Sequence, residues 1–133
     1  MKKFDNFCSN LCVLSRAKDE DLENEFIVSG IIDKFFIQFE LGWKVLKELL
    51  RYEGSSTGNT GSPREIIKAA YGMYEFIDEE TWLSMLKARN DMTHIYDGKA
   101  AKDLAFQIID TYTPAFCRMK DEIEKRYHDI NEL

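Results

Sequence analysis

Apolar side chains recur at three- and four-residue steps along nearly the whole chain, and no segment alternates with period two over the length of a strand. The pattern is longest over residues 22–52. Its apolar positions there include Val28, Ile32, Phe35, Phe39, Leu46 and Leu49. A stripe with this spacing lies on one face of a helix and needs other helices to cover it. The sequence therefore predicts an all-α protein built around one long helix.

Start and stop signals divide the rest of the chain into further helices. Residues 62–65, Ser-Pro-Arg-Glu, form a capping box with proline at the first helical position, and Asp78 offers the next cap. Asp97 and Gly98 are expected to end the helix that begins there. The expected helices cover about residues 4–16, 22–52, 63–74, 79–97 and 99–130. This order predicts a five-helix up-and-down bundle that forms a single domain over residues 1–133.

Glycines and a proline mark the places where these helices should be approached closely or interrupted. Gly30 and Gly42 lie inside the long helix. Because glycine costs up to about 1 kcal/mol there relative to alanine, another backbone is expected close to each. Residues 54–61 are rich in Gly, Ser and Thr and are expected to form a mobile loop. Pro114 is expected to kink the last helix.

The charge balance limits the partners that the surface can hold. The 133 residues include 18 Lys and Arg against 24 Asp and Glu, a net charge of −6, so the surface as a whole repels phosphate chains. A groove for RNA would need a local cluster of cations. The candidates for that cluster are Lys87, Arg89, Lys99 and Lys102.

Cysteines, histidines and the start of the chain set further expectations. An odd number of cysteines argues against a disulfide framework, and Cys8 and Cys12 are expected to pack as small apolar residues. Since His94 and His128 are the only histidines, no metal site is expected, and His128 is expected at the surface. The sequence offers neither a targeting segment nor a membrane span, which predicts a cytoplasmic protein without membrane contact.

One segment, residues 87–97, carries most of the side chains suited to chemistry. On a continuous helix Arg89 and His94 would point about 140° apart. Either the helix ends before His94, or two copies of the chain meet across a two-fold axis and share a site. An ordinary structural interpretation is also open, in which Arg89 pairs with Asp91 or Asp97 and His94 interacts with a helix C-terminus.

Four stretches, in order along the chain, carry a resemblance to a known family. They are FIQFELGWKVLK at 36–47, SPREII at 62–67, WLSML at 82–86, and the segment 89–97 with Arg-Asn followed by Thr-His-Ile-Tyr-Asp. Together they resemble the nucleotidyltransferase substrate-binding proteins of the HEPN superfamily of prokaryotic helical bundles. The resemblance covers residues 36–97 and implies a five-helix bundle of HEPN type.

The resemblance implies that the chain is one component of a two-gene module whose other component is a minimal nucleotidyltransferase. It implies a toxin-like ribonuclease centre at Arg89, Asn90 and His94. It also implies an AMP acceptor at Tyr96, which the partner would modify with its own ATP and magnesium. No cofactor of the chain itself is implied. A non-catalytic substrate-binding or docking subunit of the nucleotidyltransferase is the alternative.

These residue types suit RNA cleavage without a metal ion. A histidine can take the proton from a ribose 2′-hydroxyl, and a guanidinium can hold the negative charge that builds on the phosphorus oxygens. Because Arg89 and His94 diverge on a continuous helix, a homodimer that brings two such elements together is expected. Ile95 and Gly98 depart mildly from the family pattern, and this affects the expected loop geometry more than the chemistry.

Overall fold

The computed structural model describes residues 1–129, and within them the chain is helical without any strand. The α-helices are α1 (Lys2–Leu14), α2 (Glu25–Tyr52), α3 (Thr57–Thr60), α4 (Pro63–Met73), α5 (Glu79–Asn90), α6 (Thr93–Tyr96), α7 (Gly98–Gln107) and α8 (Thr113–Arg126). A 3-10 turn (Ala17–Asp19) follows α1, and a π turn (Ile108–Tyr112) joins α7 to α8. The predicted all-α class is confirmed.

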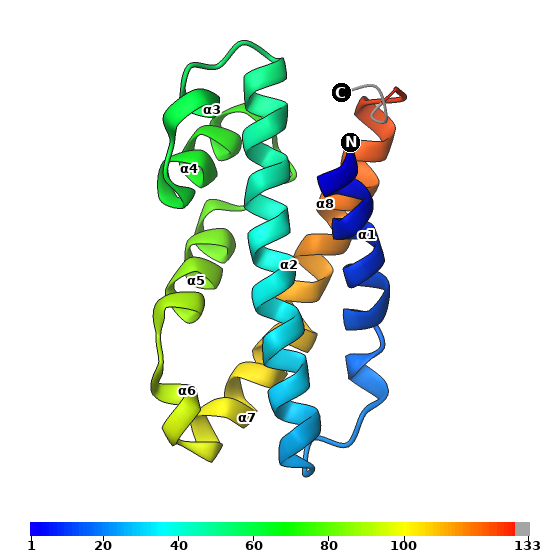
Figure 1. The fold of residues 1–133 in the computed structure, drawn as a ribbon, viewed down its shortest axis with the longest axis vertical. Helices are drawn as coiled ribbons and strands as arrows, with labels where there is room; N and C mark the ends of the chain where they lie inside the picture. Colours follow the sequence, from blue (N-terminus) through cyan, green and yellow to red (C-terminus); the bar gives the residue numbers. More distant parts are fainter. Residues whose placement is uncertain (130–133) are drawn as a thin grey trace.

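The helices run up and down around α2, which contacts α1, α3, α4, α5 and α7 (Figure 1). Helix α1 is antiparallel to α2, the pair α4 and α5 leads back along α2, and α7 with α8 returns to the end where the chain begins (Figure 1). The up-and-down order is as predicted, but the helix count of five is not. The one-turn helices α3 and α6 are additional, and a π turn divides the last helix.

Capping residues explain where the main helices begin. The Ser62 side chain accepts from the Glu65 backbone N–H at 3.3 Å, and the Asp78 carboxylate accepts from the Thr81 N–H at 3.0 Å, as predicted. Helix α2 begins at Glu25 and not at residue 22, because the Asn24 side chain accepts from the Phe26 N–H at 2.9 Å. A capping side chain at this position stops the helix from extending toward the N-terminus.

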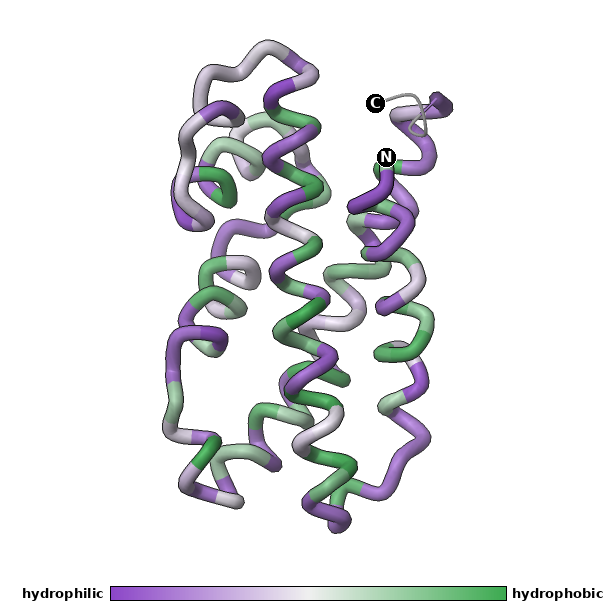
Figure 2. Tube along the Cα trace, viewed as in Figure 1, coloured by the Kyte–Doolittle hydropathy of each residue, from purple (hydrophilic) through white to green (hydrophobic). Residues whose placement is uncertain are grey.

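Aromatic residues fill the core along the inner stripe of α2. Phe35 is fully buried; its ring stacks on Tyr112 at 5.2 Å between centroids and meets Phe116 at 6.3 Å. Trp82 is also fully buried and meets Phe116 edge-on at 5.5 Å. Apolar positions recur along α2 between polar ones (Figure 2). The periodicity that predicted this helix therefore corresponds to its buried face.

The disturbance expected at Pro114 takes the form of a π turn just before it. Pro114 lies in the first turn of α8 and has no N–H to complete the regular hydrogen-bond ladder. The wider turn, Ile108–Tyr112, precedes it and ends at Tyr112, whose hydroxyl lies 2.6 Å from the Ser84 Oγ. The last helix thus continues past Pro114 as far as Arg126, while Ile130 lies outside the described residues.

Two expectations about local structure are wrong. Residues 54–61 include the one-turn helix α3, which packs on α2 so closely that a Cβ at Gly58 would come within 2.5 Å of the Arg51 nitrogen. Cys12 is exposed and does not pack as an apolar residue, since it falls on the outer face of α1. Cys8 is half-buried, and this burial raises the pKa of its thiol to about 11.

The two glycines inside α2 have different surroundings, and neither faces a backbone as expected. A Cβ at Gly42 would lie 3.1 Å from the Trp82 ring and 3.3 Å from the Phe7 ring. A Cβ at Gly30 would meet nothing within 4 Å. Packing of side chains therefore explains Gly42, whereas nothing within the described chain requires Gly30.

We predict opposite effects when each of these glycines is replaced by alanine. Gly30→Ala should raise the free energy of unfolding by about 0.5–1 kcal/mol, because alanine favours the helix and the space is open. Gly42→Ala should lower it, because the fully buried Trp82 leaves the new methyl group too little room. Urea unfolding followed by circular dichroism measures both. Equal gains in the two variants would contradict this packing argument.

Candidate functional site

The segment predicted to carry chemistry is divided between two helices. Helix α5 ends at Asn90, Asp91 is extended with φ −85° and ψ 119°, and α6 spans Thr93–Tyr96. The Asp91 carboxylate accepts from the Thr93 N–H at 2.9 Å, and Asp97 accepts from the Lys99 N–H at 2.9 Å as the cap of α7. Of the two alternatives for this segment, the helix does end before His94.

These caps have an electrostatic consequence. Hydrogen bonds from the Thr93 side chain and backbone lower the pKa of Asp91, so its carboxylate stays ionised throughout the neutral range. The stabilisation that it gives to the α5–α6 junction is present above the ordinary pKa of an aspartate and is lost as the pH falls through the lowered value. The ionised cap at Asp91 is therefore present at physiological pH.

Arg89 forms an ion pair with Glu40 of α2, and not with Asp91 or Asp97 as the structural interpretation expected. Both aspartates are held in helix caps, which explains why they are not its partners. The Glu40 carboxylate also accepts a hydrogen bond from Trp43 Nε1 at 3.1 Å. Arg89 is thus held against the middle of α2 by a carboxylate that is itself oriented by its neighbour.

His94 packs on the same face of α2. Its ring meets Phe36 with 5.4 Å between centroids and an interplanar angle of 63°. Its Nδ1 is buried and has no hydrogen-bond partner among the described residues. Since Phe36 and Glu40 are four residues apart on α2, they lie one above the other on one helix face. Arg89 and His94 of a single chain therefore contact residues on adjacent turns of α2.

Asn90 lies in a different place from this pair. It lines a groove of about 610 Å³ between α4 and α5, together with Arg64 and Lys87. Glu80, near the start of α5, lines the same groove. The structure does not bring Asn90 together with His94, because Asn90 lines the groove beside α4 whereas His94 lines a separate pocket beside α7.

Tyr96 ends α6 and is the most exposed large side chain of the candidate site. Its side chain is 88% exposed, and the neighbouring Ile95 is 55% exposed. Tyr96 and His94 both line a pocket of about 390 Å³ between the start of α2, α6 and α7. An ion pair between Lys102 of α7 and Glu23 belongs to this pocket.

The basic cluster expected for RNA is mostly neutralised. Arg89 pairs with Glu40, Lys102 pairs with Glu23, and Lys99 pairs with Asp103 at 3.2 Å. No ion pair is found for Lys87 among residues 1–129. Lys87 shares its groove with a second cation, Arg64. The cluster is less basic than the sequence predicts because the carboxylates of Glu40, Asp103 and Glu23 pair with three of its four cations.

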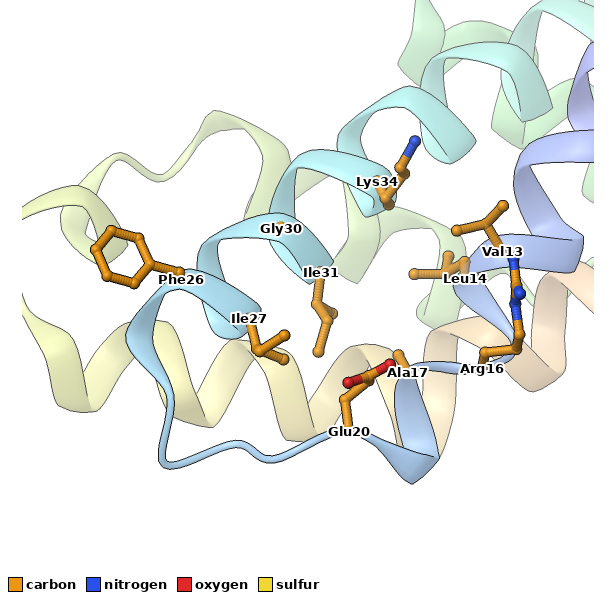
Figure 3. Close-up of a pocket in the computed structure, with 10 residues that line it drawn as sticks. All are labelled: Val13, Leu14, Arg16, Ala17, Glu20, Phe26, Ile27, Gly30, Ile31 and Lys34. Carbon is orange, nitrogen blue, oxygen red and sulfur yellow. The ribbon is translucent and has the colours of Figure 1, made fainter.

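A further hollow of about 400 Å³ lies between the end of α1 and the start of α2 (Figure 3). Ile27 and Ile31 of α2 line it, and so does Phe26, which is 81% exposed (Figure 3). The hollow contains none of the expected site residues. It therefore does not contribute to the site around Tyr96 and His94.

The remaining sequence expectations concern His128, metals and membranes. His128 is exposed, as predicted. Within the part of the chain that the structure describes, no three side chains of His, Cys, Asp or Glu are placed to hold a metal ion. In the same part, every helix is too short or too polar to cross a lipid bilayer.

Sequence reasoning missed the residues of α2 that hold the site. Phe36 and Glu40 are contacts of His94 and Arg89, and their i, i+4 spacing within the stretch FIQFELGW was the available signal. The pocket formed with Glu23 and Lys102 had no signal of this kind, because these residues are 79 positions apart.

Comparisons with known proteins identify the family of the chain. No curated protein matches the chain. One family model, described as nucleotidyltransferase substrate binding protein like, matches residues 2–125. That range includes α1 to α7 and nearly all of α8, together with Glu40, Arg89, His94 and Tyr96. Because the match spans almost the whole described bundle, the chain belongs to the family of nucleotidyltransferase substrate-binding-like proteins.

Proposed function

We propose that the chain is the HEPN component of a two-component module and that a minimal nucleotidyltransferase transfers AMP to Tyr96. The observation that carries this proposal is the 88% exposure of Tyr96 at the end of a short helix next to His94. In the proposed reaction the phenol oxygen attacks the α-phosphorus of ATP. The bond to the β-phosphate breaks, pyrophosphate leaves, and the phenol proton passes to a base of the partner or to water. The partner supplies ATP and magnesium.

The activity that this modification silences is, in our proposal, metal-independent cleavage of RNA. His94 takes the proton of a ribose 2′-hydroxyl, the oxygen attacks the adjacent phosphorus, and the 5′-oxygen leaves with a proton from solvent. Arg89 stabilises the charge on the phosphorus oxygens. The contacts of both residues with adjacent turns of α2 support these roles. Asn90, in its groove with Arg64 and Lys87, would hold the RNA strand and not the reacting phosphate.

A second candidate function is a non-catalytic subunit that presents a substrate or a docking surface to the nucleotidyltransferase. The ion pair between Arg89 and Glu40 favours it, because a guanidinium that is already paired has less charge to offer a phosphate. Both candidates include the same partner. They differ in whether the chain alone acts on RNA.

Expression of the chain without its partner separates the two candidates. If the chain is a ribonuclease, growth should stop, and His94→Ala should restore it, because the general base is lost. The matched control is His128→Ala, which removes the only other histidine, an exposed residue outside the site, and should leave growth arrested. Harmless expression of the unaltered chain at verified protein levels would exclude the ribonuclease and favour the docking subunit.

We also propose that the chain forms a homodimer. A two-fold axis would bring two Arg89–His94 elements together and let both copies contact one RNA strand. Light scattering at micromolar concentration should then give a mass near twice the 15.6 kDa of one chain. A mass of one chain under these conditions would disprove the dimer. Each chain would then act through its own Arg89 and His94.

A further inference from the structure

The hollow between the end of α1 and the start of α2 has the size and lining of a small-molecule site (Figure 3). Its volume of about 400 Å³ is within the range of about 300–1,000 Å³ that is typical of ligand pockets. The buried side chains of Leu14, Ala17 and Ile31 give it an aliphatic floor. An apolar group that enters the hollow would therefore be removed from water.

Two residues of α2 that line the hollow are unfavourable where they stand. Gly30 lies inside the helix, where glycine is less stable than alanine, and a Cβ there would meet nothing within 4 Å. Phe26, one turn earlier, exposes 81% of its surface to water. Packing within the described chain explains neither residue. Local costs of this kind are typical of functional sites, and here both occur in one hollow.

The charged side chains of the hollow limit the kind of ligand. Arg16 and Lys34 line it, and neither side chain has an ion pair or a hydrogen bond among residues 1–129. Glu20 also lines it and is likewise unpaired within that range. Two free cations and one carboxylate leave a local excess of positive charge on a chain whose net charge is −6. This lining favours a ligand with an apolar body and a single negative charge.

We propose that the hollow is a binding site for a medium-chain monocarboxylate. The tail of the ligand would lie on the aliphatic floor, beside the α2 backbone at Gly30, and its carboxylate would meet Arg16 and Lys34. The missing side chain at Gly30 leaves room for the tail, and the tail would cover part of the Phe26 ring. The proposal does not depend on the AMP transfer or the RNA cleavage proposed above.

Titration of the chain with decanoate, followed by calorimetry or NMR, tests the site. A ligand of this size should bind with a dissociation constant of the order of 1 mM or below. Octanoate, which is two methylene groups shorter, should bind about ten-fold more weakly, because it buries less apolar surface. Decylamine has the same tail with a positive charge, and it should bind at least ten-fold more weakly than decanoate.

Substitutions of the charged residues test the position of the carboxylate. Arg16→Gln and Lys34→Gln should each weaken binding of decanoate about two- to five-fold, the range expected for an exposed ion pair. Glu20→Gln should strengthen it. Lys47→Gln is the matched control, because Lys47 is also a cation of α2 without an ion pair in the described part of the chain, yet it does not line the hollow. Its binding should equal that of the unaltered chain.

Gly30→Leu tests the space for the tail. The helix should accept leucine, because the position is open, and the new side chain should abolish binding by filling the hollow. Gly72→Leu on α4 is the matched control. A Cβ at Gly72 also meets nothing within 4 Å, and this glycine does not line the hollow. Circular dichroism verifies that both variants fold.

The proposal is overturned if decanoate does not bind at several millimolar, if decylamine binds as tightly, or if Gly30→Leu and Gly72→Leu bind alike. It is also overturned if neither Arg16→Gln nor Lys34→Gln differs from Lys47→Gln. NMR shifts at the hollow that appear only with a second protein, and not with decanoate, would assign it to a protein contact instead. Since these measurements use the chain alone, their failure leaves the proposed AMP transfer and RNA cleavage to their own tests.

Discussion

Incubation of the chain with its nucleotidyltransferase, ATP and Mg²⁺ should add the mass of AMP to Tyr96 and abolish cleavage of RNA. The phenol is accessible without unfolding, since Tyr96 is 88% exposed at the end of α6. The attached nucleotide is bulky and anionic, and it would exclude the phosphate of an RNA strand by size and by charge. Mass spectrometry of peptides identifies the modified residue, and a labelled RNA reports the cleavage.

Tyr96→Phe isolates the phenol oxygen in this experiment. The variant should gain no mass and should retain its ribonuclease activity in the presence of the partner, because the phenol takes no part in proton transfer. Tyr71→Phe is the matched control, since Tyr71 is also exposed, at 52%, but lies on α4 away from the site. Tyr71→Phe should be modified and silenced like the unaltered chain. An adduct on another residue, or silencing of Tyr96→Phe by modification, would refute the Tyr96 mechanism.

The fold was largely predictable from the sequence because its signals are local. The capping box at Ser62 and the cap at Asp78 act within three residues of the helix start, and the apolar stripe of α2 repeats on one chain segment. The end of α5 was harder to predict. Apolar and polar residues continue in helical register beyond Asn90, and the break depends on the competition of Asp91 for the Thr93 N–H.

The partners of the site residues could not be predicted because they come from other helices. Within residues 87–97 the sequence suggested Asp91 and Asp97 as partners for Arg89, yet in the folded bundle Arg89 pairs with Glu40 of α2. The same holds for Lys102, whose partner Glu23 precedes α2 and is 79 residues distant in the sequence. Residue types and spacing therefore indicate candidate side chains, and tertiary packing decides which of them meet.

Substitutions should separate the proposed role of Arg89 in RNA cleavage from its ion pair with Glu40. Arg89→Ala should lower RNA cleavage by about 10²–10³-fold, a loss typical of removing one stabilising donor from a transition state. It should also lower the free energy of unfolding by about 1–2 kcal/mol, because Glu40, whose side chain is 29% exposed, keeps only the more distant Lys44, at 4.0 Å, as an ionic partner. Arg89→Lys should recover most of the stability but little of the cleavage, since an ammonium cannot hold the phosphorus oxygens as a planar guanidinium does.

The double variant Arg89→Ala with Glu40→Gln completes this test. Removing the carboxylate's charge should restore the stability that Arg89→Ala loses, because no unpaired charge remains, whereas cleavage should stay low. Arg51→Ala is the control for a surface ion pair: Arg51 lies 3.3 Å from Glu48 and is 53% exposed, so its loss should change neither quantity appreciably. If the double variant regains cleavage together with stability, Arg89 acts only by holding α5 to α2. The chain would then cleave RNA without a guanidinium, so a group other than Arg89 would stabilise the charge on the phosphorus oxygens.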